Sequence, residues 1–122
     1  AVLEVPMRFL ITFNHIDGEW DRLSPKDQER HSSRLQEFMT ALRTEKNTEL
    51  VFFHPATQAK TIRMHPDRSV EVSDGPCHQS SEQPGGFYII EADSMQDAVE
   101  WAEKGRFMVG SNEVRQIAEF PG

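Results

Sequence analysis

The stretches D-G-P at residues 74–76 and G-G-F-Y-I-I-E-A at residues 85–92 say most about the fold of this chain. The first favours a sharp, stiff turn that carries a carboxylate. The second opens with two glycines, which allow a bulge or a close approach of another backbone. Its apolar continuation, rich in aromatic and β-branched residues, predicts a strand over residues 87–92.

Outward from this strand, the sequence predicts two helices and further strands. One helix begins at Ser24-Pro25, where serine caps and proline suits the first helical position, and it fades over residues 44–47. The other begins after Ser94 and ends at Gly105. The remaining predicted strands are residues 8–13, 49–53, 61–64, 70–72 and 113–120, with a hairpin loop at 66–68 and polar loops at 14–22 and 73–84.

The resulting order, β-α-β-β-β-β-α-β, predicts an α+β fold of the ferredoxin-like sandwich type, in which an antiparallel sheet carries both helices on one face. The other face also needs cover, because the strand at residues 87–92 begins with apolar side chains on both sides. A second subunit is the natural cover, so we predict a homodimer. Residues 7–120 form one predicted domain, and residues 1–6 are expected to be a leader or a disordered segment.

Composition excludes several classes of function. The chain has 122 residues and a net charge of −7, which disfavours binding to nucleic acid. No apolar run is long enough to span a membrane. The single cysteine, Cys77, excludes an internal disulfide and a cysteine-rich zinc site, and a reducing cytoplasm is the predicted location. His15-Ile16-Asp17 has residue types that bind metals, but no spacing supplies further ligands, so neither a metal nor a cofactor is predicted.

Several short motifs occur in a characteristic order along most of the chain. They are L-S-P at 23–25, P-A-T at 55–57, D-G-P at 74–76, G-G-F-Y at 85–88, D-S at 93–94, A-V-E-W-A at 98–102 and G-S-N-E-V-R at 110–115. In order and spacing they resemble the YCII-related family, specifically its DGPF branch. The resemblance implies a dimeric α+β barrel, in which two sheets face each other across a central cavity.

The chain departs from this branch beside the turn. Cys77 stands where the family has phenylalanine, and residues 78–81 stand where it usually has an acidic residue and a lysine. In related YCII proteins a histidine on the first helix is thought to pair with an aspartate as acid and base. Here Arg34 falls near that position, and His31 lies about one helical turn away.

Asp74 is the leading candidate for an acid or base, because a rigid turn would hold its carboxylate at the mouth of a cavity. Partial burial would raise the pKa of such a carboxylate. The alternative is a turn aspartate that accepts hydrogen bonds from its own loop. His54, at a strand end before a proline, and His31, on an apolar helix face, are candidate partners. Equally, His54 suits a surface loop, and His31 suits a core or interface position.

Three residues are candidates for contact with a substrate. Arg63 lies on the strand face opposite Ile62, where it can hold an anion or face solvent. His78 is close to Asp74 in sequence. Tyr88 is most simply a core or interface residue, and Cys77 is expected to pack as a small hydrophobic side chain.

Two classes of function therefore stay open. The first is an enzyme that holds a small organic molecule in the dimer cavity, with Asp74 as acid or base; the range of reactions known for this fold supports it by analogy only. The second is a non-enzymatic binding or regulatory module, for which the resemblance implies a link to an alternative sigma factor. An acidic surface would suit a basic protein partner, and this second class predicts a narrow or filled cavity.

Overall fold

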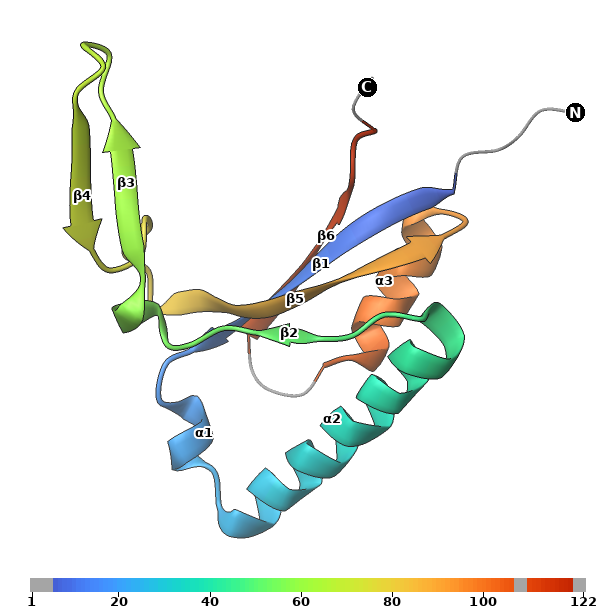
Figure 1. Ribbon diagram of the computed structural model, residues 1–122. Coiled ribbons are helices and arrows are strands. Elements are labelled where there is room, and N and C mark those ends of the chain that lie inside the picture. Colours follow the sequence, from blue (N-terminus) through green and yellow to red (C-terminus); the bar gives the residue numbers. More distant parts are fainter. Residues whose placement is uncertain (1–5, 107–109, 120–122) are drawn as a thin grey trace, which may run out of the picture.

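A computed structural model describes residues 6–106 and 110–119 of the chain. Helices and strands both contribute substantially, which confirms the predicted α+β class (Figure 1). The elements are β1 (Met7–Ile16), α1 (Glu19–Arg22), α2 (Pro25–Lys46), β2 (Val51–Phe52), the short 3₁₀ helix η1 (Ala56–Gln58), β3 (Lys60–Met64), β4 (Val70–Asp74), β5 (Glu82–Ala92), α3 (Met95–Lys104) and β6 (Gly110–Gln116).

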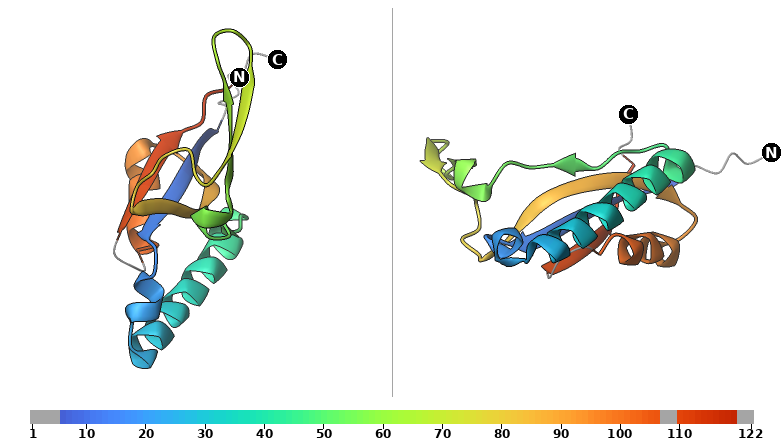
Figure 2. Two further views of the ribbon diagram at one scale, coloured as in Figure 1. Left: turned by 90° about the vertical axis from the view of Figure 1, so that its left-hand side faces the viewer. Right: turned by 90° about the horizontal axis from the view of Figure 1, so that it is seen from below.

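The main sheet has four antiparallel strands in the order β2-β5-β1-β6. Helices α2 and α3 both lie against one face of it, as Figures 1 and 2 show. Leaving β3 and β4 aside, this is the predicted ferredoxin-like arrangement of two crossover helices on an antiparallel sheet. β3 and β4 pair only with each other in the described sheets and form a separate hairpin, which we call the arm (residues 60–74).

Both long helices begin where the sequence predicts. The hydroxyls of Ser24 and Ser94 each accept a hydrogen bond from the backbone N–H three residues on, at 3.1 Å in both cases. Each cap contributes about 1 kcal/mol, because it satisfies a donor that the first helical turn leaves unpaired. α2 ends at Asn47, which adopts the left-handed conformation with φ 49°, and α3 ends at Gly105.

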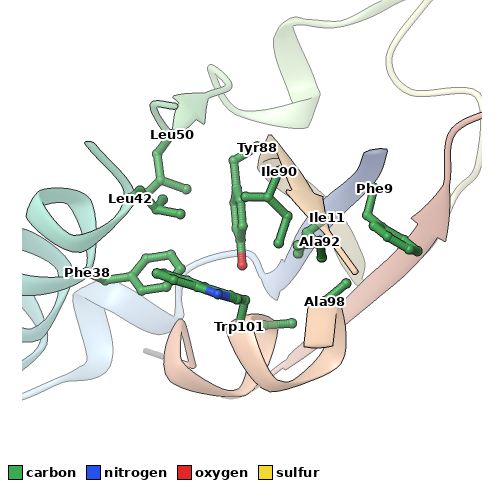
Figure 3. Packing of buried hydrophobic residues seen from close by; sticks show 11 residues of the cluster. Phe9, Ile11, Phe38, Leu42, Leu50, Tyr88, Ile90, Ala92, Ala98 and Trp101 are labelled. Carbon is green, nitrogen blue, oxygen red and sulfur yellow. The ribbon is translucent and has the colours of Figure 1, made fainter. Parts of the chain in front are cut away.

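The hydrophobic core lies between the helices and the sheet (Figure 3). Phe9 and Ile11 of β1 face it at alternate positions, as one face of a strand must. From the helix side, the Phe38 ring packs edge-on against Tyr88, with centroids 5.5 Å apart. The remaining members of this buried cluster are Leu42, Leu50, Ile90, Ala92, Ala98, Trp101 and Ala102.

The opposite face of the sheet, here called the open face, also carries apolar side chains. Leu10 pairs with Ile89 there, and Phe87 contacts the ring of Phe53 at a centroid distance of 5.8 Å. Leu10, Phe87 and Ile89 are half-buried, whereas Val51 is exposed. No helix of the described residues covers this face, and the arm rises from one end of the sheet on the same side (Figures 1 and 2).

Several element boundaries differ from the sequence prediction. β1 continues to Ile16 and is followed by α1, although residues 14–22 were expected to form a loop. β5 begins at Glu82 rather than at residue 87, because Ile16 and Glu82 extend the ladder between the two strands. β6 covers Gly110–Gln116 rather than residues 113–120. Residues 1–5 and 120 lie outside the described part of the chain, so the predicted leader and last strand residue are not described.

The two glycines of β5 mark a β-bulge. Phe13 of β1 pairs with Gly86, but the next residue, Asn14, pairs with Pro84, so Gly85 is the extra residue. A side chain on Gly86 would run into the carbonyl of Val51 and the ring of Phe13. The predicted reason for the glycine pair, a bulge with a close backbone approach, is therefore confirmed.

We predict that Gly86→Ala destabilises the chain by about 2 kcal/mol or more, because overfilling a packed site moves its neighbours. The measurement is urea unfolding followed by far-UV circular dichroism. Exposed Ser81→Ala is the control and should change stability by no more than about 0.5 kcal/mol. An unaltered midpoint in Gly86→Ala would contradict the close approach.

Candidate functional site

A cleft opens on the helix side of the sheet, between α2, α3 and the far end of β1. Its volume is about 770 Å³, within the range of sites that hold small organic molecules. The walls are mostly apolar and come from several elements. Representative wall residues are Phe13, Ile16, Leu35, Phe52, Val99 and Val114. We call this space the helix-side cleft.

Two histidines lie among the polar residues that line the helix-side cleft, which also include Asp21, Glu103 and Arg106. His31 lies on α2, and its Nδ1 atom is buried with no hydrogen-bond partner among the described residues. His15 lies near the end of β1, with Nε2 at 3.8 Å from Oδ1 of Asp17. Imidazoles donate or accept hydrogen bonds and exchange protons near neutral pH. The cleft can therefore both orient a polar group and take part in proton transfer.

The local backbone explains why these side chains reach the cleft. His15 is two residues beyond Phe13, so strand alternation places both on the helix side of the sheet. A Cβ atom on Gly85 would lie only 2.5 Å from Nδ1 of His15, so glycine leaves the space that this ring occupies. On α2, His31 and Leu35 are four residues apart and share one helix face.

The turn at Asp74 is well fixed but lies away from the helix-side cleft. Gly75 has φ 93°, the conformation that favours glycine, and its N–H donates to the carbonyl of Ala59 at 2.7 Å. The Thr61 hydroxyl donates to the Gly75 carbonyl at 2.9 Å. The Asp74 side chain is 85% exposed and forms an ion pair with Lys60. Its carboxylate lines no described cavity of this chain, and its catalytic role stays a prediction.

The other predicted site residues are dispersed. His54 and His78 are exposed, and neither lines the helix-side cleft. Arg63 is exposed on the arm, and its Nη2 donates to the carbonyl of Cys77 at 3.2 Å. Cys77 is exposed as well, so the prediction that it packs as a hydrophobic side chain is wrong. Among the predicted catalytic residues, only His31 lies at the cleft.

Tyr88 lies in the core at 2% exposure, which confirms the simpler of its two interpretations. Figure 3 shows its hydroxyl directed toward Trp101 and α3. That hydroxyl has no hydrogen-bond partner among the described residues. Burial raises the pKa of Tyr88 above the ordinary value of 10.0, since the apolar surroundings disfavour the phenolate.

Sequence reasoning missed His15 as a cleft residue and considered it only as a metal ligand. The available signal was strand alternation continued beyond Phe13 to His15. Within residues 6–106 and 110–119, no group of three or more histidine, cysteine or acidic side chains is placed to hold a metal ion. No helix in the same ranges has the length and apolar character needed to cross a membrane.

The sheet order, the two helices on one face and the cleft beside them define a ferredoxin-like α+β domain. Residues 7–121 match the family model of the YCII-related domain, and the chain belongs to that family. An uncharacterised protein of Rhizobium meliloti (strain 1021) is 38% identical over 72 residues, which is 56% of this chain and 57% of that protein. The match thus spans little more than half of each protein. Membership of the DGPF branch stays a prediction.

We predict that Tyr88→Phe stabilises the chain by about 1 kcal/mol, because it removes a buried hydroxyl that lacks a partner. Tyr88 is the one tyrosine of the sequence, so ultraviolet absorbance reports its ionisation directly. Well below pH 10.0, its ordinary pKa, Tyr88 is neutral in both the folded and the unfolded chain. Above that pH the unfolded chain ionises first, so the free energy of unfolding declines as the pH rises. Tyr88→Phe should therefore lose less stability than the parent chain in alkaline urea titrations. A destabilised Tyr88→Phe would show that the hydroxyl has a partner.

Proposed function

We propose that this chain binds a small, largely apolar organic molecule in the helix-side cleft and acts on it by proton transfer. The observation that carries the proposal is a mostly apolar cleft of about 770 Å³ with two histidines, His15 and His31, in its walls. Apolar walls favour the body of an organic ligand, and an imidazole can form a hydrogen bond with its polar group.

The composition of the walls limits the class of ligand. Aromatic and aliphatic side chains, such as Phe13, Phe52 and Val99, favour a compact aromatic or alicyclic body. The histidines favour one or two polar substituents, of the hydroxyl, carbonyl or carboxyl type. Phenols and small aromatic acids combine both features. We therefore expect ligands of this class.

His15 and Asp17 support an enzymatic role over simple binding. The carboxylate of Asp17, 3.8 Å from Nε2 of His15, favours a defined orientation of the ring. In our proposal His15 accepts a proton from the bound molecule, and His31 holds the polar group on which negative charge develops. The regulatory alternative linked to a sigma factor concerns the cavity between two subunits, and it stays a prediction.

We further propose that two copies of the chain associate through the open face. The support is its band of apolar side chains, which includes Leu10, Phe87 and Ile89 and continues to Val51 and Phe53. Contiguous apolar surface of this kind is typical of an interface. Asp74 is exposed in a single chain, so its predicted acid–base role requires surface from another molecule.

We predict that Ser32→Phe fills the helix-side cleft and weakens ligand binding more than tenfold. Ser32 lines the cleft, whereas its neighbour Ser33 is exposed and does not, so Ser33→Phe is a matched control with the same added ring. The measurement is ligand-observed NMR with a set of phenols and small aromatic acids, followed by calorimetric titration of the tightest binder. Equal binding by both variants would place the ligand elsewhere, and absence of binding to the parent chain would refute the proposal.

The role of His31 is tested on the same ligand. His31→Ala should weaken binding about fivefold to tenfold, because the ligand loses its hydrogen bond with the imidazole. A hydrogen bond between neutral groups contributes about 1 kcal/mol. His54→Ala, at an exposed histidine outside the cleft, should leave the affinity unchanged. If the two substitutions have the same effect, His31 does not hold the ligand.

We predict that the parent chain sediments as a dimer at micromolar concentration and that Ile89→Lys shifts it toward monomer. A lysine on the open face introduces a charge that the interface would have to desolvate. Arg34→Glu, an exposed change on α2, is the control. A monomeric parent chain, or a dimer that tolerates Ile89→Lys, would contradict association through the open face.

A further inference from the structure

The arm has one mainly apolar face that the described chain leaves uncovered. Ile62 pairs with Val72 and Met64 pairs with Val70, so these four side chains lie together on one side of the hairpin. They are 71%, 64%, 74% and 57% exposed, respectively. The opposite side of the hairpin is polar. Exposed aliphatic side chains gathered in this way mark an interaction surface.

Few described hydrogen bonds attach the arm to the rest of the domain. A two-stranded hairpin is at best marginally stable in water. Its attachment to the domain lies at the base, where Gly75 bonds to Ala59 and Arg63 bonds to Cys77. Beyond that base, the arm stands clear of the main sheet (Figures 1 and 2). Cover from another molecule would therefore contribute to its stability as well as to binding.

The charges on this face indicate what covers it. Lys60 pairs with Asp74 in the same register, two residues from Ile62 and Val72, so both lie on the apolar side of the hairpin. The face thus holds one cation and one anion and is neutral, in a chain whose net charge is −7. A basic protein would find no excess of acidic groups here. Under a twofold rotation, however, Lys60 of one arm can face the Asp74 carboxylate of another, so the surface is complementary to itself.

We propose that the apolar face of the arm is a self-association surface, covered by the same face of the arm of a second copy of this chain. Four aliphatic side chains alone fall short of the roughly 800 Å² per partner that a stable interface buries. The open face lies on the same side of the molecule as the arm (Figure 1), and in this proposal the two surfaces act together in one interface. The arm contact thus adds to association through the open face, and it does not depend on the helix-side cleft.

This contact changes the surroundings of Asp74. In a single chain its carboxylate is 85% exposed beside Lys60. In the paired arms this ion pair lies at the edge of a dry aliphatic contact, where charges interact more strongly than in water. A second copy therefore supplies the enclosure that the turn at Asp74 lacks in the single chain.

The first test compares Val72→Lys with Ser73→Lys in the full chain. Val72 is on the apolar face, and Ser73 is the next residue, exposed on the polar face, so the added lysine is the same while the side of the arm differs. Sedimentation equilibrium should show a dissociation constant at least about tenfold higher for Val72→Lys, since burying an unpaired charge costs more than 1.4 kcal/mol. Ser73→Lys should match the parent chain. Circular dichroism and thermal unfolding establish that both variants are folded.

The second test maps the contact directly. In a Cys77→Ser background, Val72→Cys should form a covalent dimer with a short bismaleimide, and Ser73→Cys should stay monomeric under the same treatment. Equal self-association of the two lysine variants, absence of cross-linking at position 72, or a parent chain that is monomeric throughout would each overturn the proposal. Loss of association in Ile89→Lys without loss in Val72→Lys would remove the arm contact and leave the open-face dimer. Ligand titration of each variant reports the helix-side cleft separately.

Discussion

The close approach of three strands at Gly85 and Gly86 is the constraint on which the rest of the structure depends. Phe13, His15 and the carbonyl of Val51 all occupy space that a side chain at these two positions would fill. The same bulge lets β1 and β5 stay paired to Ile16 and Glu82. The end of β1 that this pairing fixes carries Phe13, His15 and Ile16 in the wall of the helix-side cleft.

The two faces of the main sheet carry different features. The helix side combines a packed aromatic core around Phe38 and Tyr88 with a cleft further along the same strands. The open face combines a flat apolar band with an arm at its end. The proposed site of chemistry and the proposed surface for assembly thus lie on opposite faces of the sheet.

Sequence reasoning predicted those features that depend on neighbours in the chain. The caps at Ser24 and Ser94 and the glycine pair depend on local geometry, and all are confirmed. It could not predict the surroundings of Asp74, because these depend on which elements lie side by side. Residues 82–86, E-Q-P-G-G, have low strand propensity and did not predict the first part of β5. They are part of that strand because they pair with β1.

The base of the arm has a further consequence for how this domain can vary. The hydrogen bond from Gly75 to Ala59 brings the two ends of the hairpin together at 2.7 Å between nitrogen and oxygen. The main sheet takes its order from β2, β5, β1 and β6 and draws no ladder hydrogen bonds from residues 60–74. The arm is therefore closed at its own neck, and the residues beyond that neck form no ladder with the main sheet. Substitutions beyond the neck therefore alter the surface of the arm while the ladders of the main sheet stay intact.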